Sequence, residues 1–161
     1  MMIASLYVPA LIKILFPSLD ISIPLYNQLI IDNPNNYEYH LYLGALYGLK
    51  SRIALAKNQW MRVFFSSIKG YNLIDKVHEN NDALFDALTP IGIISYYSSI
   101  SNPFIKTSAK ILGIYPDSKY GIELLEVASE ESYYSWIESS NILTYIYLYM
   151  ERDYKKALDK I

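Results

Sequence analysis

Helix-breaking residues recur along this chain at intervals about the length of a helix, and this spacing limits the fold more than any other feature. The breakers are Pro17, Asn33-Pro34, Asn58, Asn80-Asn81-Asp82, Asn102-Pro103, Pro116-Asp117, Ser132 and Arg152-Asp153. Asn, Asp and Ser favour helix N-termini because a short side-chain oxygen accepts a free backbone N–H there, and proline suits the first helical turn. Between breakers, apolar residues recur three and four positions apart, as at Leu143, Ile146 and Met150. This period is typical of amphipathic helices.

These boundaries predict an all-α protein made of antiparallel helical hairpins, with about eight to nine helices. The expected helices span residues 3–16, 19–32, 37–57, 59–78, 82–100, 104–113, 118–130, 133–151 and 153–161. Strand signals are weak, since no stretch alternates cleanly with period two and no Asn-Gly or Asp-Gly turn occurs. Short loops force consecutive helices to lie antiparallel. A length of 161 residues suits one domain, so we treat residues 1–161 as a single helical-repeat domain.

Composition excludes several classes of protein. The chain contains no Cys, which rules out disulfides, Cys-based metal sites and a Cys nucleophile. Its 14 basic and 16 acidic side chains nearly balance, so no overall positive charge points to nucleic acid as a partner. A hydrophobic content of 52% argues against disorder.

The apolar N-terminal segment fits neither a membrane span nor a signal peptide well. A spanning helix needs about 20 apolar residues, whereas Pro9 and Lys13 interrupt residues 1–16 and Pro17 follows them. The segment also has no basic start and no small-residue cleavage site. We therefore expect an apolar helix that packs on the next one, and membrane association near the N-terminus is the less favoured reading. The cytoplasm is the default compartment, with the cell envelope or periplasm as the alternative.

An internal repeat becomes visible when the chain is shifted against itself by 100 positions. Glu38, Leu43, Tyr47 and Arg52 then fall on Glu138, Leu143, Tyr147 and Arg152. This shift is close to three periods of about 34 residues, the length of a tetratricopeptide repeat.

The spacing of small and aromatic residues resembles the same repeat. The residues concerned are Leu43-Gly44 with Tyr47, then Ser22, Tyr26, Leu29 and Pro34, and finally Asp153-Tyr154 with Ala157. A wider resemblance, to bacterial tetratricopeptide repeat proteins with lengthened first helices, covers about residues 18–161. It rests on residues 43–52, Trp60, Tyr96-Tyr97, and residues 113–117, 121–125 and 151–158. The resemblance implies an α-α superhelix in which small residues let paired helices approach and aromatics fill the gaps. Residues 82–116 depart from the pattern except at Ile91-Gly92, and Pro24 lies inside an expected helix.

The sequence contains no specific catalytic or metal-binding motif. His40 and His78 are the only histidines, and neither has a second histidine at zinc-binding spacing. The glycines are isolated from one another, so no phosphate-binding loop is present. We expect no catalytic residue, no metal and no cofactor, and we expect both histidines to be partly exposed helix residues.

The resemblance implies a concave groove lined by first helices, and this is where we expect a partner to bind. The expected groove residues are Glu38, Leu41, Ala45, Gly48 and Arg52 on one helix, and Glu138, Asn141, Tyr145 and Arg152 on the other. The favoured function is a noncatalytic interaction module or scaffold that binds a peptide or protein segment there. In the alternative reading, these residues simply pack against the neighbouring repeat.

Two further functions stay open at this point, namely a carrier of a small apolar ligand or lipid and, less favoured, an enzyme on a helical fold. A basic cluster around Trp60 contains Lys50, Arg52, Lys57 and Arg62. We interpret it as a source of surface salt bridges rather than as a nucleic-acid site. Tyr145, Tyr147 and Tyr149 cannot all be core residues, because alternate residues on a helix point apart.

The last expected helix is short and carries an apolar face of Tyr154, Ala157, Leu158 and Ile161. Terminal repeats need a polar outer face for solubility. We therefore expect either that the chain is a segment of a longer array or that this end is buried in a partner, including a second copy of the chain.

Overall fold

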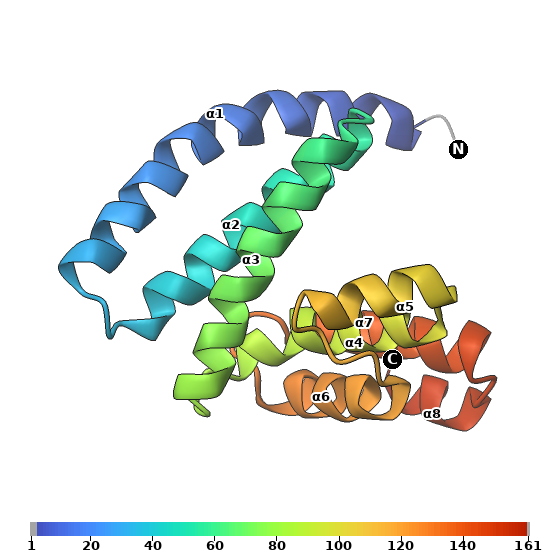
Figure 1. Cartoon of the computed structure of the whole chain (residues 1–161). Coiled ribbons are helices and arrows are strands. Elements are labelled where there is room, and N and C mark those ends of the chain that lie inside the picture. Colours follow the sequence, from blue (N-terminus) through green and yellow to red (C-terminus); the bar gives the residue numbers. More distant parts are fainter. Residues whose placement is uncertain (1–2, 161) are drawn as a thin grey trace. The chain divides into compact units, whose positions relative to one another are not determined.

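The computed structural model describes residues 3–160, with side chains from Pro17 onward, and this part of the chain is helical without strands (Figure 1). The elements are α1 (Ile3–Asp32), α2 (Tyr37–Ala56), α3 (Trp60–Asn80), η1 (Phe85–Ala87), α4 (Leu88–Ile100), α5 (Pro103–Ile111), α6 (Ser118–Glu131), α7 (Trp136–Tyr145), η2 (Ile146–Met150) and α8 (Tyr154–Asp159). The all-α prediction and the expected number of helices are confirmed. The chain divides into two compact units, Met1–Asn80 and Asn81–Ile161.

The predicted break after residue 16 is wrong, because α1 runs unbroken from Ile3 to Asp32. Proline inside a helix removes one hydrogen bond and crowds the preceding turn, but a helix can continue through it with a bend where tertiary contacts stabilise the helical conformation. Such contacts follow Pro17, since Leu19 and Ile23 are buried in a cluster with residues of α2. Figure 1 shows α1 as one curved helix that passes through this region.

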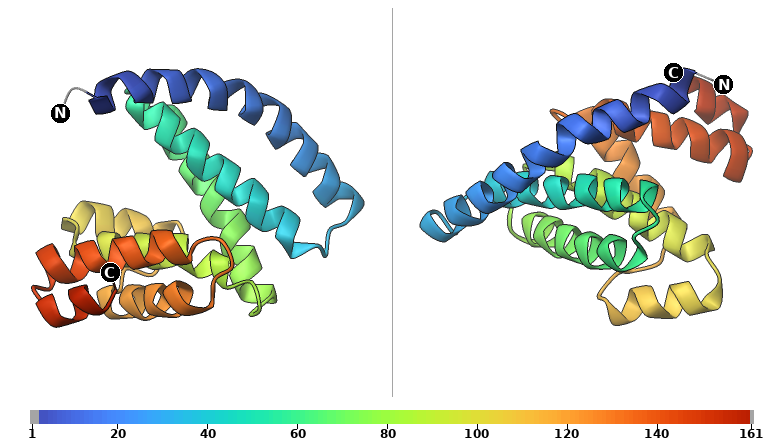
Figure 2. Two further views of the ribbon diagram at one scale, coloured as in Figure 1. Left: turned by 180° about the vertical axis from the view of Figure 1, so that it is seen from behind. Right: turned by 90° about the horizontal axis from the view of Figure 1, so that it is seen from above.

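Helices α2 and α3 form the closest pair in the first unit, and they lie side by side in both views of Figure 2. Their contact point is a pair of glycines: a Cβ placed on Gly70 would lie 3.0 Å from the carbonyl oxygen of Gly44. Away from this point, Ser51 Oγ on α2 lies 2.7 Å from Ser67 Oγ on α3. The two helices therefore approach closely along the hairpin, as the resemblance implied for small residues.

His40 is buried, with 2% of its surface exposed, so the expectation that it is partly exposed is wrong. Its Nδ1–H donates to the carbonyl oxygen of Asn36 at 3.1 Å, and its Nε2 accepts from Lys76 Nζ at 3.1 Å. A buried imidazole is tolerated when both of its nitrogens are hydrogen-bonded. His78 is half-buried, as expected.

The second unit is built on a second glycine pair, between α4 and α6. A Cβ on Gly92 would lie 2.8 Å from the carbonyl oxygen of Gly121, and a Cβ on Gly121 would lie 2.7 Å from that of Gly92. Around this crossing, α7, η2 and α8 complete a core. Its buried members are Tyr96, Leu125, Leu143, Ile146, Tyr147 and Ala157.

Polar contacts fix the start of α7 against the segment that leads into α4. The Asp86 carboxylate accepts the backbone N–H groups of Tyr133, Tyr134 and Ser135, with donor–acceptor distances of 3.1, 2.9 and 2.7 Å. Below it, the buried Thr89 hydroxyl lies 2.6 Å from Ser139 Oγ. The predicted helix 133–151 therefore begins as α7 only at Trp136, because Asp86 captures the preceding amides in a turn.

Candidate functional site: an acidic cleft along helix α6

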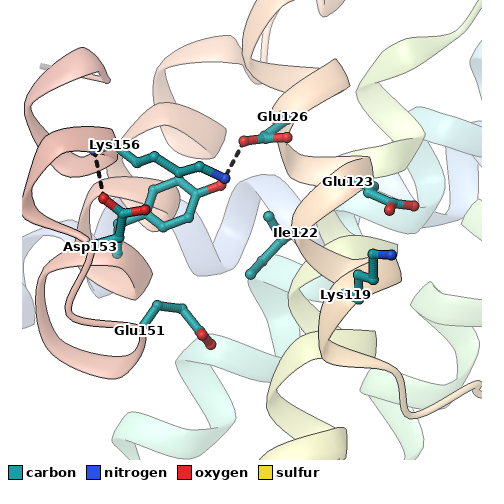
Figure 3. A pocket seen from close by; sticks show the side chains of 8 residues that line it. Lys119, Ile122, Glu123, Glu126, Glu151, Asp153 and Lys156 are labelled. Atoms are coloured by element: carbon teal, nitrogen blue, oxygen red, sulfur yellow. Dashed lines mark hydrogen bonds between the residues drawn. The ribbon is translucent and has the colours of Figure 1, made fainter.

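An open cleft of about 360 Å³ lies between α6 on one side and the η2–α8 region on the other. It is lined by Lys119, Ile122, Glu123, Glu126, Tyr147, Glu151, Asp153 and Lys156. Figure 3 shows Asp153 and Lys156 on one side of the cleft and Ile122 and Glu126 on the other. The cleft lies within the second unit, so one compact body holds all of its walls.

The α6 wall follows from local sequence. Asp117 begins the helix, and its Oδ1 accepts the backbone N–H groups of Lys119 at 2.9 Å and Tyr120 at 3.1 Å. Positions three and four apart share one helix face, so Lys119, Glu123 and Glu126 line the same side of α6. This cap was predicted from the Pro116-Asp117 breaker.

Two buried tyrosines hold the carboxylates at the rim of the cleft. Tyr147 OH donates to Glu126 Oε1 at 2.6 Å, and Tyr96 OH donates to Glu151 Oε1 at 2.7 Å. Burial raises the pKa of each phenol well above its usual range, and the hydrogen bond and negative charge of its glutamate raise that pKa further. Both phenols therefore stay protonated at neutral pH and act as fixed hydrogen-bond donors.

The second wall depends on a π-helical turn, η2, that continues α7. The wider turn is followed by Arg152 in the left-handed region at a φ of 58°. The backbone N–H of Asp153 then donates to the carbonyl oxygen of Tyr147 at 2.8 Å. As a result Tyr147 is buried while Tyr145 and Tyr149 are exposed, which confirms that the three tyrosines do not share the core. Single π-helical turns occur frequently at functional sites.

The charge of the cleft is predominantly negative. Four carboxylates, those of Glu123, Glu126, Glu151 and Asp153, face the ammonium groups of Lys119 and Lys156. Lys156 Nζ lies 5.1 Å from the ring centroid of Tyr147, which is within cation–π range. Among the described residues, no group of three or more His, Cys, Asp or Glu side chains is placed to hold a metal ion.

A second open cleft, of about 700 Å³, adjoins the first at the N-terminal end of α6. It is lined by Lys110, Tyr115, Pro116, Asp117, Lys119, Tyr120 and Glu123. Lys119 and Glu123 belong to both clefts. Together the two clefts form one concave surface that has room for more than one side chain of a ligand. We call this surface the α6 cleft.

The groove residues expected from the sequence lie elsewhere. On α2, Glu38, Ala45 and Arg52 are exposed, Gly48 is half-buried, and Leu41 is buried in the core. In the second unit, Glu138, Asn141, Tyr145 and Arg152 are all exposed. A single groove formed by both stripes stays a prediction.

The carboxylates of the α6 cleft were not foreseen as a site. The signal available in the sequence was the spacing of Glu123 and Glu126, three residues apart on an expected helix. Nothing in the sequence indicated the π-helical turn that places Tyr147 against this face of α6.

Comparisons with protein-family models, with curated proteins and with solved structures each returned no match for this chain. Across the part of the chain that the structure describes, no helix is both long enough and apolar enough to span a membrane.

Replacing Tyr147 by Phe is expected to lower the free energy of unfolding at pH 7 by about 1 kcal/mol, because the bond to Glu126 is lost. The raised phenol pKa also makes the native state keep this proton after the unfolded chain has released it. The unmodified protein therefore loses stability above about pH 10, by up to about 1.4 kcal/mol per pH unit for each such tyrosine. The stability deficit of Tyr147→Phe should therefore shrink above about pH 10. Urea unfolding at neutral and at alkaline pH measures this change.

The matched control is Tyr149→Phe, because Tyr149 lies two residues away and is exposed. We expect this change to leave the stability at pH 7 nearly unaltered. A Tyr147→Phe deficit of the same size at neutral and at alkaline pH would contradict the proposed coupling between the phenol proton and folding.

Proposed function

We propose that this protein is a noncatalytic interaction module of helical-repeat type, and that its α6 cleft binds an extended, positively charged segment of a partner protein. The observation that carries the proposal is the open cleft of about 360 Å³ whose rim bears four carboxylates. The second cleft continues it past Lys119 and Glu123 and offers the exposed ring of Tyr115. A peptide that places Lys or Arg side chains between the carboxylates would have charge-assisted hydrogen bonds available to it.

The rigidity of the rim supports binding of a peptide. Glu126 and Glu151 are held by phenol donors at 2.6 and 2.7 Å, so little side-chain freedom remains for a ligand to remove. Binding surfaces that are ordered beforehand lose less entropy on association. An acidic rim would also steer a cationic segment toward the cleft, with a rate that falls as salt rises.

The lining of the cleft favours a peptide over the alternative of an apolar carrier. Of the eight residues that line the first part of the α6 cleft, Ile122 is the only aliphatic one, and six are charged. Sites for small apolar ligands are lined mainly by hydrophobic side chains with few polar groups. A lipid tail in this cleft would leave carboxylates without water, which is costly. We keep the tetratricopeptide assignment and the cytoplasmic compartment as parts of this proposal.

A peptide-display library with random sequences tests the proposal directly. Selection on the intact chain should enrich peptides that contain Lys and Arg, and calorimetry should show binding that weakens as salt is added. Glu123→Lys should weaken binding at least about tenfold, equivalent to about 1.4 kcal/mol, because it reverses an exposed charge that borders both parts of the α6 cleft.

The control is Glu131→Lys, an identical charge change at an exposed position of α6 outside the cleft lining. It should bind the selected peptides as the unmodified chain does. Enrichment of acidic or purely apolar peptides, or equal loss of binding in both variants, would count against the α6 cleft.

A further inference from the structure

The first unit carries a second surface that the α6 cleft does not explain. Trp60, Met61, Phe64 and Phe65, at the start of α3, are each between 49% and 67% exposed. With about 3.6 residues per turn, Phe64 follows Trp60 by one turn and Phe65 follows Met61, so the four side chains form one block on the helix. Soluble proteins rarely leave several large apolar side chains together in water without a binding role.

The stretch of sequence around these four residues is basic and contains no acidic residue. Between positions 39 and 74 the chain has five Lys or Arg side chains and no Asp or Glu, although the overall charge of the chain is −2. The five are Lys50, Arg52, Lys57, Arg62 and Lys69. We call residues 50–69 the hairpin tip, since they comprise the end of α2, the loop and the start of α3.

Contacts within the hairpin bring cations from both helices together. Lys50 Nζ of α2 and Lys69 Nζ of α3 lie 5.9 and 5.6 Å from the ring centroid of the same residue, Tyr47. Ser51 Oγ bonds both Ser67 Oγ and the backbone oxygen of Val63, which ties α2 to α3 beside the apolar block. The positive charge and the exposed aromatic rings therefore belong to one rigid element.

We infer that the hairpin tip is a membrane-contact surface that binds the interface of a bilayer containing anionic phospholipids. Trp and Phe side chains prefer the headgroup boundary, and nearby Lys and Arg side chains are attracted by anionic lipids. Aromatic residues, Met and Arg are also enriched in protein interfaces, whereas Lys is depleted there. Three of the five cations of the tip are lysines, and this favours a bilayer interface over a protein partner.

Two further observations favour a lipid surface over nucleic acid. Leu55 and Met61 of the hairpin tip are also exposed, and aliphatic side chains gain nothing from base stacking. The first half of α1 lies in the same unit, and its sequence from residue 3 to residue 16 contains a single charged residue, Lys13. This proposal rests on the first unit alone and is independent of the α6 cleft.

The test uses the fluorescence of Trp60 in the 161-residue chain carrying Trp136→Phe, which leaves Trp60 as the only tryptophan of that chain. Vesicles of phosphatidylcholine mixed with phosphatidylglycerol should shift the emission to shorter wavelength and carry the protein with them in flotation. Phosphatidylcholine alone should do neither, and added salt should weaken binding to the mixed vesicles.

Variants on exposed positions separate binding from folding. Arg62→Glu and the pair Phe64→Ala with Phe65→Ala should each weaken binding to mixed vesicles at least about tenfold. The matched controls are Lys155→Glu and Phe104→Ala, which change exposed residues of the second unit outside the α6 cleft and should bind as before. Circular dichroism checks that every variant keeps its helices.

Three outcomes would overturn the inference. They are no binding to mixed vesicles, equal binding to neutral vesicles, and equal losses in the tip variants and the two control variants. Tight binding of single-stranded RNA that quenches Trp60, without any binding to vesicles, would instead assign the tip to nucleic acid.

Discussion

Gly92→Ala and Gly121→Ala should each lower the free energy of unfolding of the second unit by about 2–3 kcal/mol. The added Cβ would lie 2.8 Å from the Gly121 carbonyl oxygen in the first variant and 2.7 Å from the Gly92 carbonyl oxygen in the second. Because the obstructing atoms belong to the backbone, the two helices must separate to admit a methyl group. This loss outweighs the gain of about 1 kcal/mol that alanine brings to a helix interior.

Gly48→Ala is the matched control, since a Cβ there meets no atom within 4 Å. It should leave stability unchanged or raise it by up to about 1 kcal/mol. Urea unfolding of Gly92→Ala and Gly121→Ala would be followed by the fluorescence of Trp136 in a chain with Trp60→Phe, and that of Gly48→Ala by the fluorescence of Trp60 in a chain with Trp136→Phe, because each tryptophan lies in the unit concerned. If Gly92→Ala and Gly121→Ala shift their unfolding midpoints no more than Gly48→Ala shifts its own, the close crossing of α4 and α6 is contradicted.

Asp86→Ala should lower the free energy of unfolding by about 2 kcal/mol. This is the second of the two largest effects that we expect from single substitutions. One carboxylate accepts three consecutive backbone N–H groups, those of Tyr133, Tyr134 and Ser135. Removing the carboxylate takes away all three hydrogen bonds at once, so the start of α7 loses this anchor. Hydrogen exchange can locate the loss of stability, because these three backbone amides should exchange faster in Asp86→Ala than in the unmodified chain.

Asp86→Asn gives the graded comparison. Its amide oxygen can still accept from Tyr134 and Ser135, while the charge and the bond to Tyr133 are lost, so its deficit should fall between those of the unmodified chain and Asp86→Ala. Asp82→Ala, at an exposed position nearby in sequence, should change stability by less than about 0.5 kcal/mol. Equal stabilities of Asp86→Ala and Asp82→Ala would show that the carboxylate does not anchor α7.

Local signals predicted much of the fold correctly. The breakers at Asn102, Asp117 and Asp153 were expected to begin helices, and in the structure each side chain accepts a backbone N–H of the following first turn. These contacts lie within a few residues of one another, so spacing alone reveals them. The role of Gly44 and Gly92 in close helix contacts was also foreseen in kind, from the resemblance to a repeat with small residues at such positions.

Features that depend on tertiary contacts were missed. The continuation of α1 through Pro17 depends on packing against α2, and the burial of His40 depends on Lys76, which lies 36 residues away. The α6 cleft combines Glu126 with Tyr147 across 21 residues, through a π-helical turn that has no sequence signature. No local pattern encodes those pairings, and the stacking of the hairpins into a superhelix stays a prediction.

Backbone amide chemical shifts, recorded as a selected basic peptide is added to the ¹⁵N-labelled chain, test most directly where a partner binds. The account predicts that the largest shifts occur at positions 119–126 on α6 and 151–156 before and within α8, the two walls of the cleft. Shifts confined to the stripe of Glu38 and Ala45 on α2, or to that of Glu138 and Asn141 on α7, would contradict it and restore the groove expected from the sequence.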